Sequence, residues 1–353
     1  DLSSSALSSL LFLSNFYFYF VDNYFADAST LKPLLHTWSL SVEEQFYFLF
    51  PPLLYFLNLR KKNILFILIF LILFSLIFSH ITSIYLKELN FYIIISRIWE
   101  LGIGALIAFL HFKEKKKTNF TNNYLAYVSV FLLILPFFYF DENTLHPSLF
   151  SVFTITGTSL IIYYKDDKNL IKKFLSSKPL VGIGLISYSL YLWHYPILAF
   201  KNIKSDNLSE FDKLEAIILA IVISIISFFV IEKPFRNKKI IKKKRFFTII
   251  ITSFLFLLFS SSYIIYSKGL PKRFSTEVLS LIDFNYEYKK IYQTGSCHIE
   301  NKKIFNDEFF SKCIVNKSNK KNLYIWGDSL GAHLYPGIKL KYGNNYNIFQ
   351  RTV

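Results

Sequence analysis

Long runs of apolar residues, separated by clusters of lysine, recur along the chain. A helix crosses a bilayer with roughly 17 to 25 apolar residues, and flanking residues extend a shorter run when the helix tilts. The candidate spans are residues 5–21, 44–58, 63–81, 92–111, 124–140, 147–164, 180–200, 213–231 and 246–266. The composition agrees, because 53% of the 353 residues are hydrophobic and 19% are aromatic. The sequence therefore predicts an all-α polytopic membrane bundle with about nine spans in a lipid bilayer.

The basic residues are distributed unevenly between alternate loops. Twenty Lys and Arg lie in four loops, and only five lie in the four loops between these. The basic loops are residues 60–62, 113–117, 165–178 and 233–245, and the others are residues 22–37, 82–91, 141–146 and 201–213. By the positive-inside rule the basic loops are cytoplasmic, which predicts a multi-pass protein of the inner (cytoplasmic) membrane. Because the net charge of +16 follows from this topology and forms no single basic surface, we expect no nucleic-acid partner.

Residues 271–353 are more polar and contain both cysteines of the chain. The span before them runs outward in this topology, so we expect them to be extracytoplasmic. Cys297 and Cys313 are 16 positions apart, and a disulfide that closes a loop of this size contributes roughly 3 kcal/mol. We predict this disulfide, with two unpaired thiols as the alternative. The predicted domains are residues 1–240, a membrane domain; residues 241–270, a connecting span; and residues 271–353, a linker and the beginning of an outer domain.

Both ends of the chain look interrupted. The chain starts at Asp1 and contains no methionine, so it has neither an initiator nor a recognisable signal peptide. Its last residues, "NIFQRTV", follow soon after the polar region begins. We therefore expect the chain to be a fragment.

Ionisable residues from three predicted spans share one depth in the membrane. His36 and Glu43 lie at the outer mouth of span 44–58, Arg97 and Glu100 lie in the outer turns of span 92–111, and His194 lies near the outer end of span 180–200. An ionisable residue in lipid costs on the order of 3 kcal/mol, so these side chains should face the interior of the bundle. This layer is the predicted site.

Each of these residues also has a structural interpretation. Ser41 and Glu44 fit a capping box at a helix start. Arg97 and Glu100 are three residues apart and can neutralise each other. His194 can be an interfacial residue at a helix end. His36 and Glu43 have weaker structural interpretations, and for these two we favour a role in function.

Four motifs resemble one known family. The segments "LLHTWSLSVEEQFYFLFP", "RIWELGIGAL", "GLISYSLYLWHYPI" and "IEKPFR", in this order, resemble the membrane-bound acyltransferase family 3. The later segment "YIWGDSLGAHLYPG" resembles the first sequence block of an SGNH hydrolase-like domain, which many of these proteins carry at the C-terminus. The resemblance implies an α/β, flavodoxin-like SGNH domain whose start alone is present here.

The resemblance also implies a function. Such proteins transfer an acyl group, usually acetyl from cytoplasmic acetyl-CoA (acyl-CoA), to a hydroxyl of an extracytoplasmic glycan such as lipopolysaccharide O-antigen, peptidoglycan or another surface polysaccharide. It implies no metal. Lys233 and Arg236, in the motif "IEKPFR", are the candidates for contact with the CoA phosphates at the inner face, and simple anchoring of the span is the alternative.

The chain departs from the family pattern in two places. The family's N-terminal span with an arginine and a catalytic histidine is absent, so we expect about two further spans before Asp1 and do not assign that histidine's role to His36. In the outer domain Gly327 permits a tight turn and Ser329 fits the nucleophile, but no Asp-x-x-His follows. His333 would share the helical face of Ser329, and we interpret it as structural. We expect the fragment alone to be inactive.

Two other classes of function remain possible from the residues alone. A transporter or flippase would also use charged residues around a central cavity. No inverted repeat is visible, and an outer serine domain has no use in a pore, so we favour the O-acyltransferase. A membrane scaffold would explain the lysines but not the polar layer.

Overall fold

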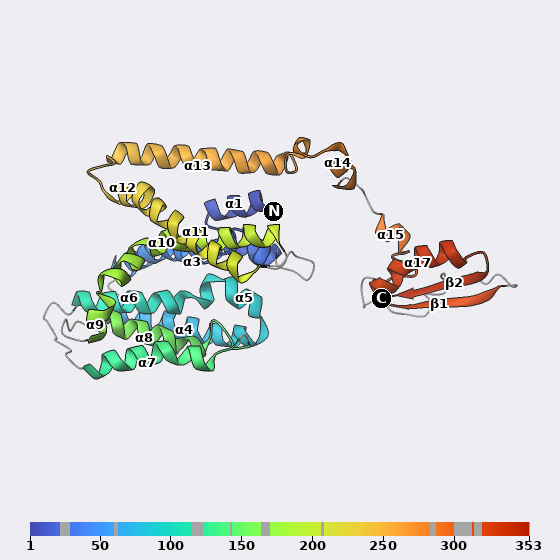
Figure 1. Cartoon of the computed structure of the whole chain (residues 1–353). Coiled ribbons are helices and arrows are strands. Elements are labelled where there is room, and N and C mark those ends of the chain that lie inside the picture. The colour runs from blue at the N-terminus through green and yellow to red at the C-terminus, as the bar shows by residue number, and fades with distance from the viewer. Residues whose placement is uncertain are drawn as a thin grey trace. The chain divides into compact units, whose positions relative to one another are not determined.

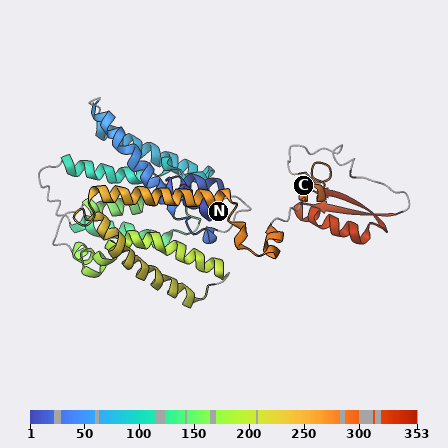
Figure 2. The same ribbon diagram turned by 90° about the horizontal axis from the view of Figure 1, so that it is seen from above.

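The computed structural model describes residues 1–21, 29–59, 63–113, 123–141, 143–163, 170–205, 208–282, 287–299, 313 and 320–352. These residues form two compact units, Asp1–Leu270 (unit 1) and Pro271–Val353 (unit 2). In unit 1 most helices run roughly along one common direction, as Figures 1 and 2 show. This is the arrangement of a helix bundle, which the sequence predicts.

The helices of unit 1 differ widely in length. Their bounds are α1 Leu2–Leu10, α2 Ser14–Val21, η1 Ser29–Leu31, α3 Thr37–Leu59, α4 Ile64–Tyr85, α5 Lys87–Tyr92, η2 Ile94–Ser96, α6 Ile98–Lys113, α7 Asn123–Tyr139, η3 Leu149–Ser151, α8 Val152–Tyr163, α9 Leu170–Leu175, α10 Lys178–Lys204, α11 Glu210–Ser227, η4 Phe228–Glu232, α12 Lys233–Arg236 and α13 Lys243–Tyr266. The last turns of the helix that begins at Glu210 are π-helical in η4, and the helix then continues into α12.

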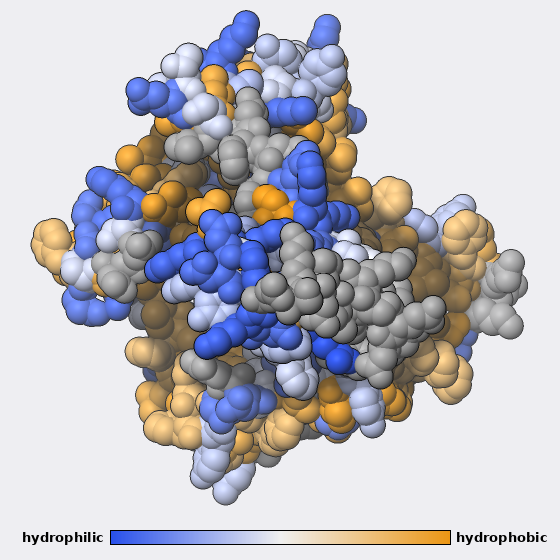
Figure 3. Space-filling model, turned by 90° about the vertical axis from the view of Figure 1, so that its right-hand side faces the viewer, coloured by the Kyte–Doolittle hydropathy of each residue, from blue (hydrophilic) through white to orange (hydrophobic). Residues whose placement is uncertain are grey.

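Several helices of unit 1 suit an apolar solvent. Within the described residues, α4, α10, α13 and the continuous helix Glu210–Arg236 are long and apolar enough to cross a membrane, and α6, α7 and α8 are shorter apolar helices. Large apolar side chains are exposed on them, among them Phe137, which is 86% exposed. Figure 3 shows hydrophobic residues along much of the visible flanks. The prediction of a mostly helical membrane protein with several spans is confirmed.

Two of the predicted spans are interrupted or shortened in the structure. The predicted span 5–21 is not one helix, because α1 ends at Leu10 and α2 begins at Ser14. Phe12 between them has φ 56°, a left-handed conformation that ends a helix and that non-glycine residues rarely adopt. The predicted span 92–111 begins only at Ile98, after the short helices α5 and η2. Both expectations for these boundaries were wrong.

The helix α3 begins earlier than the motif "SVEE" indicates. Its first residue is Thr37, so Ser41 lies inside the helix. Ser41 is buried, and its hydroxyl is hydrogen-bonded to the hydroxyl of Ser14 over 2.7 Å. The capping-box interpretation of Ser41 and Glu44 is therefore wrong. The helix also continues through Pro51 and Pro52, a pattern that helices in membranes tolerate.

Small side chains and hydroxyl groups form many helix contacts of unit 1. The helices α7 and α8 approach closely at Gly157, where an added Cβ would lie 2.8 Å from the carbonyl oxygen of Ser129. The hydroxyl of Ser79 on α4 donates to the carbonyl oxygen of Pro147 over 2.9 Å, and Asn90 donates to the same oxygen over 2.8 Å. Such contacts are typical of helix packing in membranes, where burial of apolar surface gives little drive for association.

Unit 2 contains a strand–helix–strand motif. The strand β1 (Lys321–Gly327) pairs in parallel with β2 (Tyr346–Thr352), and α17 (Ser329–Tyr342) connects them (Figure 1). The short helices before the motif are η5 Pro271–Arg273, α14 Thr276–Ile282 and α15 Tyr288–Ile291. Cys297 and Cys313 form a disulfide with Cα atoms 5.6 Å apart. Ile299 and Cys297 also exchange backbone hydrogen bonds with Thr352, so this segment lies along β2.

Some residues behind the topology prediction lie outside the described residues. These are residues 60–62, 114–117 and 165–168, which hold much of the basic charge of three predicted cytoplasmic loops. The assignment of the two membrane sides therefore stays a prediction.

Candidate functional site

Two histidines and two tyrosines form a cluster of rings between α3 and α10. The ring of His36, directly before α3, lies 5.8 Å from the ring of His194 on α10. It also lies 5.4 Å from the rings of Tyr191 and Tyr195, and it is stacked on Tyr195. We call these four residues the ring cluster. It brings together two of the residues that the sequence predicts for the site, His36 and His194.

Hydrogen bonds fix the orientation of the ring cluster. The hydroxyl of Tyr191 donates to the carbonyl oxygen of His36 over 2.7 Å and is also hydrogen-bonded to the hydroxyl of Ser39. Nδ1 of His194 lies 2.8 Å from the carbonyl oxygen of Tyr191, which can only accept. Nδ1 of His194 therefore carries the proton, and Nε2 of its neutral ring is left as an acceptor. Because α10 continues to Lys204, the interpretation of His194 as a helix-end residue is wrong.

His36 is buried without a well-aligned hydrogen bond at either ring nitrogen. The residue is only 6% exposed. Its ring lies near the backbone of Pro33 and Leu192. Burial, together with the neighbouring His194, lowers the pKa of His36 to about 4. His36 is therefore neutral at physiological pH, and both of its nitrogens remain available for exchange of a proton or a hydrogen bond.

Arg97 is the centre of a second polar cluster. Its Nη1 lies 3.2 Å from Oε2 of Glu100, so the two residues neutralise each other as one interpretation of their spacing expects. The same nitrogen lies 3.3 Å from Nε2 of His146 in the loop before η3. The guanidinium also lies over the rings of Trp38 and Phe91, at 5.1 and 5.4 Å from their centroids. Through Trp38, which is two residues after His36, this cluster adjoins the start of α3.

The tautomer of His146 follows from its two partners. Arginine has no acceptor atom, so Nε2 of His146 accepts the hydrogen bond from Arg97. Nδ1 then carries the proton and donates to the hydroxyl of Ser151 over 2.9 Å. Partial burial and the adjacent guanidinium lower the pKa of His146 to about 4, which keeps the ring in this neutral form.

A third group, of charged residues, lies one to two helical turns from the ring cluster, toward the C-terminus of α3 and the N-terminus of α10. The carboxylates of Glu43 and Glu44 act electrostatically on Tyr188, and the carboxylate of Glu232 does so from η4. The charge of Glu43 also acts on Tyr191, which belongs to the ring cluster. Of the predicted residues in this third group, Glu43 is therefore the one that interacts with the ring cluster. The polar side chains thus continue from the ring cluster along the facing sides of α3 and α10.

The candidates for contact with the acyl donor are only partly free. Oε1 of Glu232 lies 2.8 Å from Nη2 of Arg236, and its Oε2 accepts from the hydroxyl of Ser189 over 2.8 Å. Arg236 therefore carries a compensated charge. Lys233 lies over the ring of Phe229 at 5.2 Å and extends along the apolar surface.

Several residues of the site are missing from the predicted set. Ser39 follows His36 at helical spacing, and Tyr188 and Tyr191 recur at the same spacing before His194, so periodicity could have identified them. No spacing rule points to His146, because it lies in a loop and reaches Arg97 only through the tertiary fold.

Ser329 lies in unit 2 at the first position of α17, directly after the turn that follows β1. Its residue is exposed, and the preceding Asp328 caps the helix by accepting from the backbone N–H of Leu330 over 2.9 Å. His333 is one turn further on, but its Nδ1 is hydrogen-bonded to the hydroxyl of Tyr292 over 2.9 Å. The geometry therefore gives His333 a partner other than Ser329.

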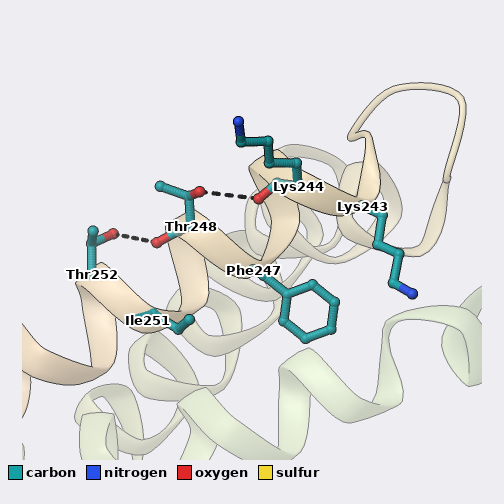
Figure 4. A pocket seen from close by; sticks show the side chains of 6 residues that line it. All are labelled: Lys243, Lys244, Phe247, Thr248, Ile251 and Thr252. Atoms are coloured by element: carbon teal, nitrogen blue, oxygen red, sulfur yellow. Dashed lines mark hydrogen bonds between the residues drawn. The ribbon is translucent and has the colours of Figure 1, made fainter.

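One pocket of the described residues is separate from these side chains. It has a volume of about 720 Å³ and lies along α13, where its lining residues all come from this one helix (Figure 4). The hydroxyls of Thr248 and Thr252 in it donate to carbonyl oxygens of their own helix, at 3.0 and 2.8 Å. Among the described residues, no group of three or more His, Cys, Asp and Glu side chains could hold a metal ion.

Comparisons with known proteins identify the family. The "O-acetyltransferase OatA" of Staphylococcus aureus (strain NCTC 8325 / PS 47) is 28% identical over 253 residues, which are 67% of this chain and 42% of the relative. The "Putative O-acetyltransferase SACOL0978" of Staphylococcus aureus (strain COL) is 31% identical over 251 residues, 66% of this chain and 41% of the relative. The chain thus spans about two fifths of these relatives. No solved structure matches it. Residues 2–233, which include the ring cluster and the Arg97 cluster, match the family described as "Acyltransferase domain", and the chain belongs to this acyltransferase family 3.

Proposed function

We propose that the protein is an O-acyltransferase that moves an acyl group, usually acetyl, from cytoplasmic acetyl-CoA to a hydroxyl of an extracytoplasmic glycan. The observation that supports this most strongly is the ring cluster, because it joins His36 and His194 from two separate motifs inside the region of the acyltransferase match. The names of the two relatives, both O-acetyltransferases, agree with transfer to a hydroxyl oxygen. The glycan is an O-antigen, peptidoglycan or another surface polysaccharide.

We assign His194 the handling of the proton. The bond from its Nδ1 to a backbone carbonyl orients the ring and leaves Nε2 unprotonated, which is the form that accepts a proton from a hydroxyl. Neutral His36 lies beside it and can pass a proton on or hold the acceptor group. Glu43, on the same side of α3, would stabilise positive charge that develops on the histidines.

The donor would be bound at the opposite, basic end of the bundle. Lys233 and Arg236 are the candidates there, and the ion pair of Arg236 with Glu232 would open when a phosphate competes for the guanidinium. In this proposal the polar side chains along α3 and α10 lead from this end toward the ring cluster.

We further propose that unit 2 is the beginning of an SGNH domain with Ser329 as its nucleophile. The strand–turn–helix order of β1, Gly327 and α17 supports this, because it presents an exposed serine at a helix start where backbone N–H groups can stabilise an oxyanion. The domain would receive the acyl group on the outer side of the membrane and pass it to the glycan.

The test of the membrane site is His194→Gln in the natural protein, expressed in cells that lack it. We expect the O-acetyl content of the surface glycan, measured by mass spectrometry, to fall at least a hundredfold, because the amide cannot accept the proton. The control is His111→Gln on α6, whose ring lies against Tyr163. Wild-type O-acetylation by the His194→Gln protein would contradict the proposed site.

The test of unit 2 is Ser329→Ala in the same cells. We expect the loss of glycan acylation while slow turnover of acetyl-CoA by the membrane unit persists, because the donor site does not contain this serine. Full O-acetylation by the Ser329→Ala protein would leave the membrane unit as the sole catalyst.

Reporter fusions test the predicted topology. Fusions after Asp141 and Lys272 should read as outside, and those after Lys117 and Lys244 should read as cytoplasmic. A cytoplasmic reading at Lys272 would refute the outer location of unit 2.

A further inference from the structure

The guanidinium of Arg97 lies where several segments of unit 1 meet. Its central carbon is 5.1 Å from the ring centroid of Trp38 on α3 and 5.4 Å from that of Phe91 on α5. Its Nη1 is 3.2 Å from Oε2 of Glu100 on α6 and 3.3 Å from Nε2 of His146 in the loop before η3. The residue is 8% exposed, so these contacts take the place of water. They therefore decide where the charge lies.

Glu100 and His146 hold the same nitrogen from different segments. Glu100 is three residues after Arg97, so this carboxylate alone would draw the guanidinium along α6. His146 accepts from Nη1 on another side and adds no negative charge, because its ring is neutral. Since the two acceptors share Nη1, the loss of one leaves the guanidinium to the other.

The loop that carries His146 is itself anchored in the bundle. The carbonyl oxygen of Pro147 accepts hydrogen bonds from Ser79 on α4 over 2.9 Å and from Asn90 on α5 over 2.8 Å. Nδ1 of His146 is hydrogen-bonded to the hydroxyl of Ser151 over 2.9 Å, which fixes the ring and its tautomer. An acceptor with this support can direct a long and flexible side chain such as an arginine.

One of the rings against Arg97 belongs to the start of α3. Trp38 is the second residue of this helix, and His36 of the ring cluster directly precedes the helix. The attraction between a cation and an indole ring is stronger where water is excluded. Arg97 thereby connects the start of α3 to the beginning of α6.

We propose that His146 is a positioning residue, whose Nε2 keeps Arg97 on the ring of Trp38 and thereby fixes the start of α3 beside His36. Without this acceptor the guanidinium turns toward Glu100, the indole loses the cover of one face, and His36 loses its fixed position. The expected effect on acyl transfer rests on the proposed function, whereas the effect on Trp38 does not.

Two amide variants separate the acceptor from the rest of the ring. In His146→Gln the side-chain oxygen is as many bonds from Cβ as Nε2 is, so it can accept from Arg97. In His146→Asn the oxygen is only as far from Cβ as Nδ1, so it does not extend to Arg97. Both side chains are neutral and smaller than imidazole, and a role in packing alone would be lost in both. The control is His111→Asn on α6, whose ring lies against Tyr163.

The first measurement needs no substrate. The fluorescence of Trp38 in the natural protein, purified in detergent, is the difference between each protein and the same protein with Trp38→Phe. Acrylamide quenching of this fluorescence should rise about twofold in His146→Asn, because the face of the indole is uncovered. His146→Gln and His111→Asn should keep the wild-type quenching.

The second measurement is transfer of acetyl from acetyl-CoA to the glycan, in membranes with equal amounts of each protein. We expect His146→Asn to lower the rate about fivefold and His146→Gln to retain more than half of it. If His146→Asn does not accumulate in the membrane, Ser151→Ala replaces it. That variant removes the partner of Nδ1, so the proton can move to Nε2, which then no longer accepts from Arg97.

The outcomes separate this inference from the proposed function. Unchanged quenching of Trp38 in the variant without the acceptor overturns the inference. So does an equal loss of transfer in His146→Gln and His146→Asn, and so does normal transfer despite increased quenching. If the wild-type protein transfers no acetyl group, the proposed function is overturned, and the quenching alone still decides whether His146 places Arg97.

Discussion

The hydroxyl of Tyr191 donates a hydrogen bond to the carbonyl oxygen of His36 over 2.7 Å and thereby ties α10 to the residue before α3. The same hydroxyl is hydrogen-bonded to Ser39, in the first turn of α3. The two helices that carry the ring cluster are thus held together at the level of the cluster itself. A change at this hydroxyl alters the position of His36 without touching its ring.

Tyr191→Phe keeps the ring and removes both hydrogen bonds. Since one such bond contributes about 0.5 to 1.5 kcal/mol, we expect glycan acylation to fall by about two- to tenfold as His36 loses its fixed position. The control is Tyr139→Phe on α7, where the tyrosine is 77% exposed. Unchanged acylation in Tyr191→Phe would show that this link is not needed.

Glu43→Gln removes one negative charge and keeps the shape of the side chain. In the proposed site it abolishes glycan acylation and leaves the protein in the membrane, because the amide cannot stabilise positive charge on the histidines. Quantitative immunoblotting of membranes and mass spectrometry of the glycan check the two parts. Glu215→Gln, at an exposed carboxylate that pairs with Lys201, is the control.

Arg97→Ala leaves Glu100 as an uncompensated, mostly buried charge. We expect a loss of roughly 3 to 5 kcal/mol in the free energy of unfolding. The double variant Arg97→Ala, Glu100→Ala should lose less than Arg97→Ala alone, because no charge is then left unpaired. Thermal unfolding in detergent measures stability, and glycan acylation should be absent in both variants; normal acylation in either would remove Arg97 from the proposed site.

Gly157→Ala tests the close contact of α7 and α8. The new Cβ would lie 2.8 Å from a backbone oxygen, so the helices must move apart, and we expect a loss of about 1 to 3 kcal/mol in stability. Gly104→Ala on α6 is the matched control, because no atom lies within 4 Å of its new Cβ. This variant should be neutral or gain up to about 1 kcal/mol from helix propensity. Equal unfolding temperatures for the two variants would refute the close contact.

The pKa of His36 predicts a dependence of stability on pH. In the folded protein this pKa is about 4, below its ordinary value of 6.5, so the unfolded chain binds the proton more readily. The contribution of His36 is therefore fully present above pH 6.5 and is lost as the pH falls from 6.5 to 4, by up to about 3 kcal/mol. Thermal unfolding at pH 7 and pH 4.5 should show a smaller decrease for His36→Gln than for wild-type protein.

The sequence predicts those helices of this fold that correspond to long, uninterrupted apolar runs. Apolar runs identify α4, α10, α11 and α13, because a span of that length has few alternatives in water or lipid. The break at Phe12 was not predictable, since nothing in its composition signals a left-handed residue. The start of α3 was missed because the motif after Ser41 imitates a helix cap.

The sequence also predicts the candidate site in part. His36 and His194 stand out as ionisable residues in apolar segments, and the cost of exposing them to lipid indicates an interior cluster. Their partners Tyr191 and Tyr195 read as ordinary aromatic residues of a span, although their spacing matches. The contact of Arg97 with His146 joins residues 49 positions apart through a loop, and only the packing of α4, α6 and η3 creates it.

Serine hydroxyls at helix contacts, such as those of Ser14 and Ser41, affect how freely the chain can evolve. A hydrogen bond of this kind between membrane helices contributes about 0.6 kcal/mol on average, and alanine or glycine preserves the small size that the contact needs. Lineages can therefore exchange these residues one at a time without losing the bundle. Arg97 and Glu100 lack this freedom, because the loss of one leaves the other charged in the interior, so their replacement has to occur in pairs.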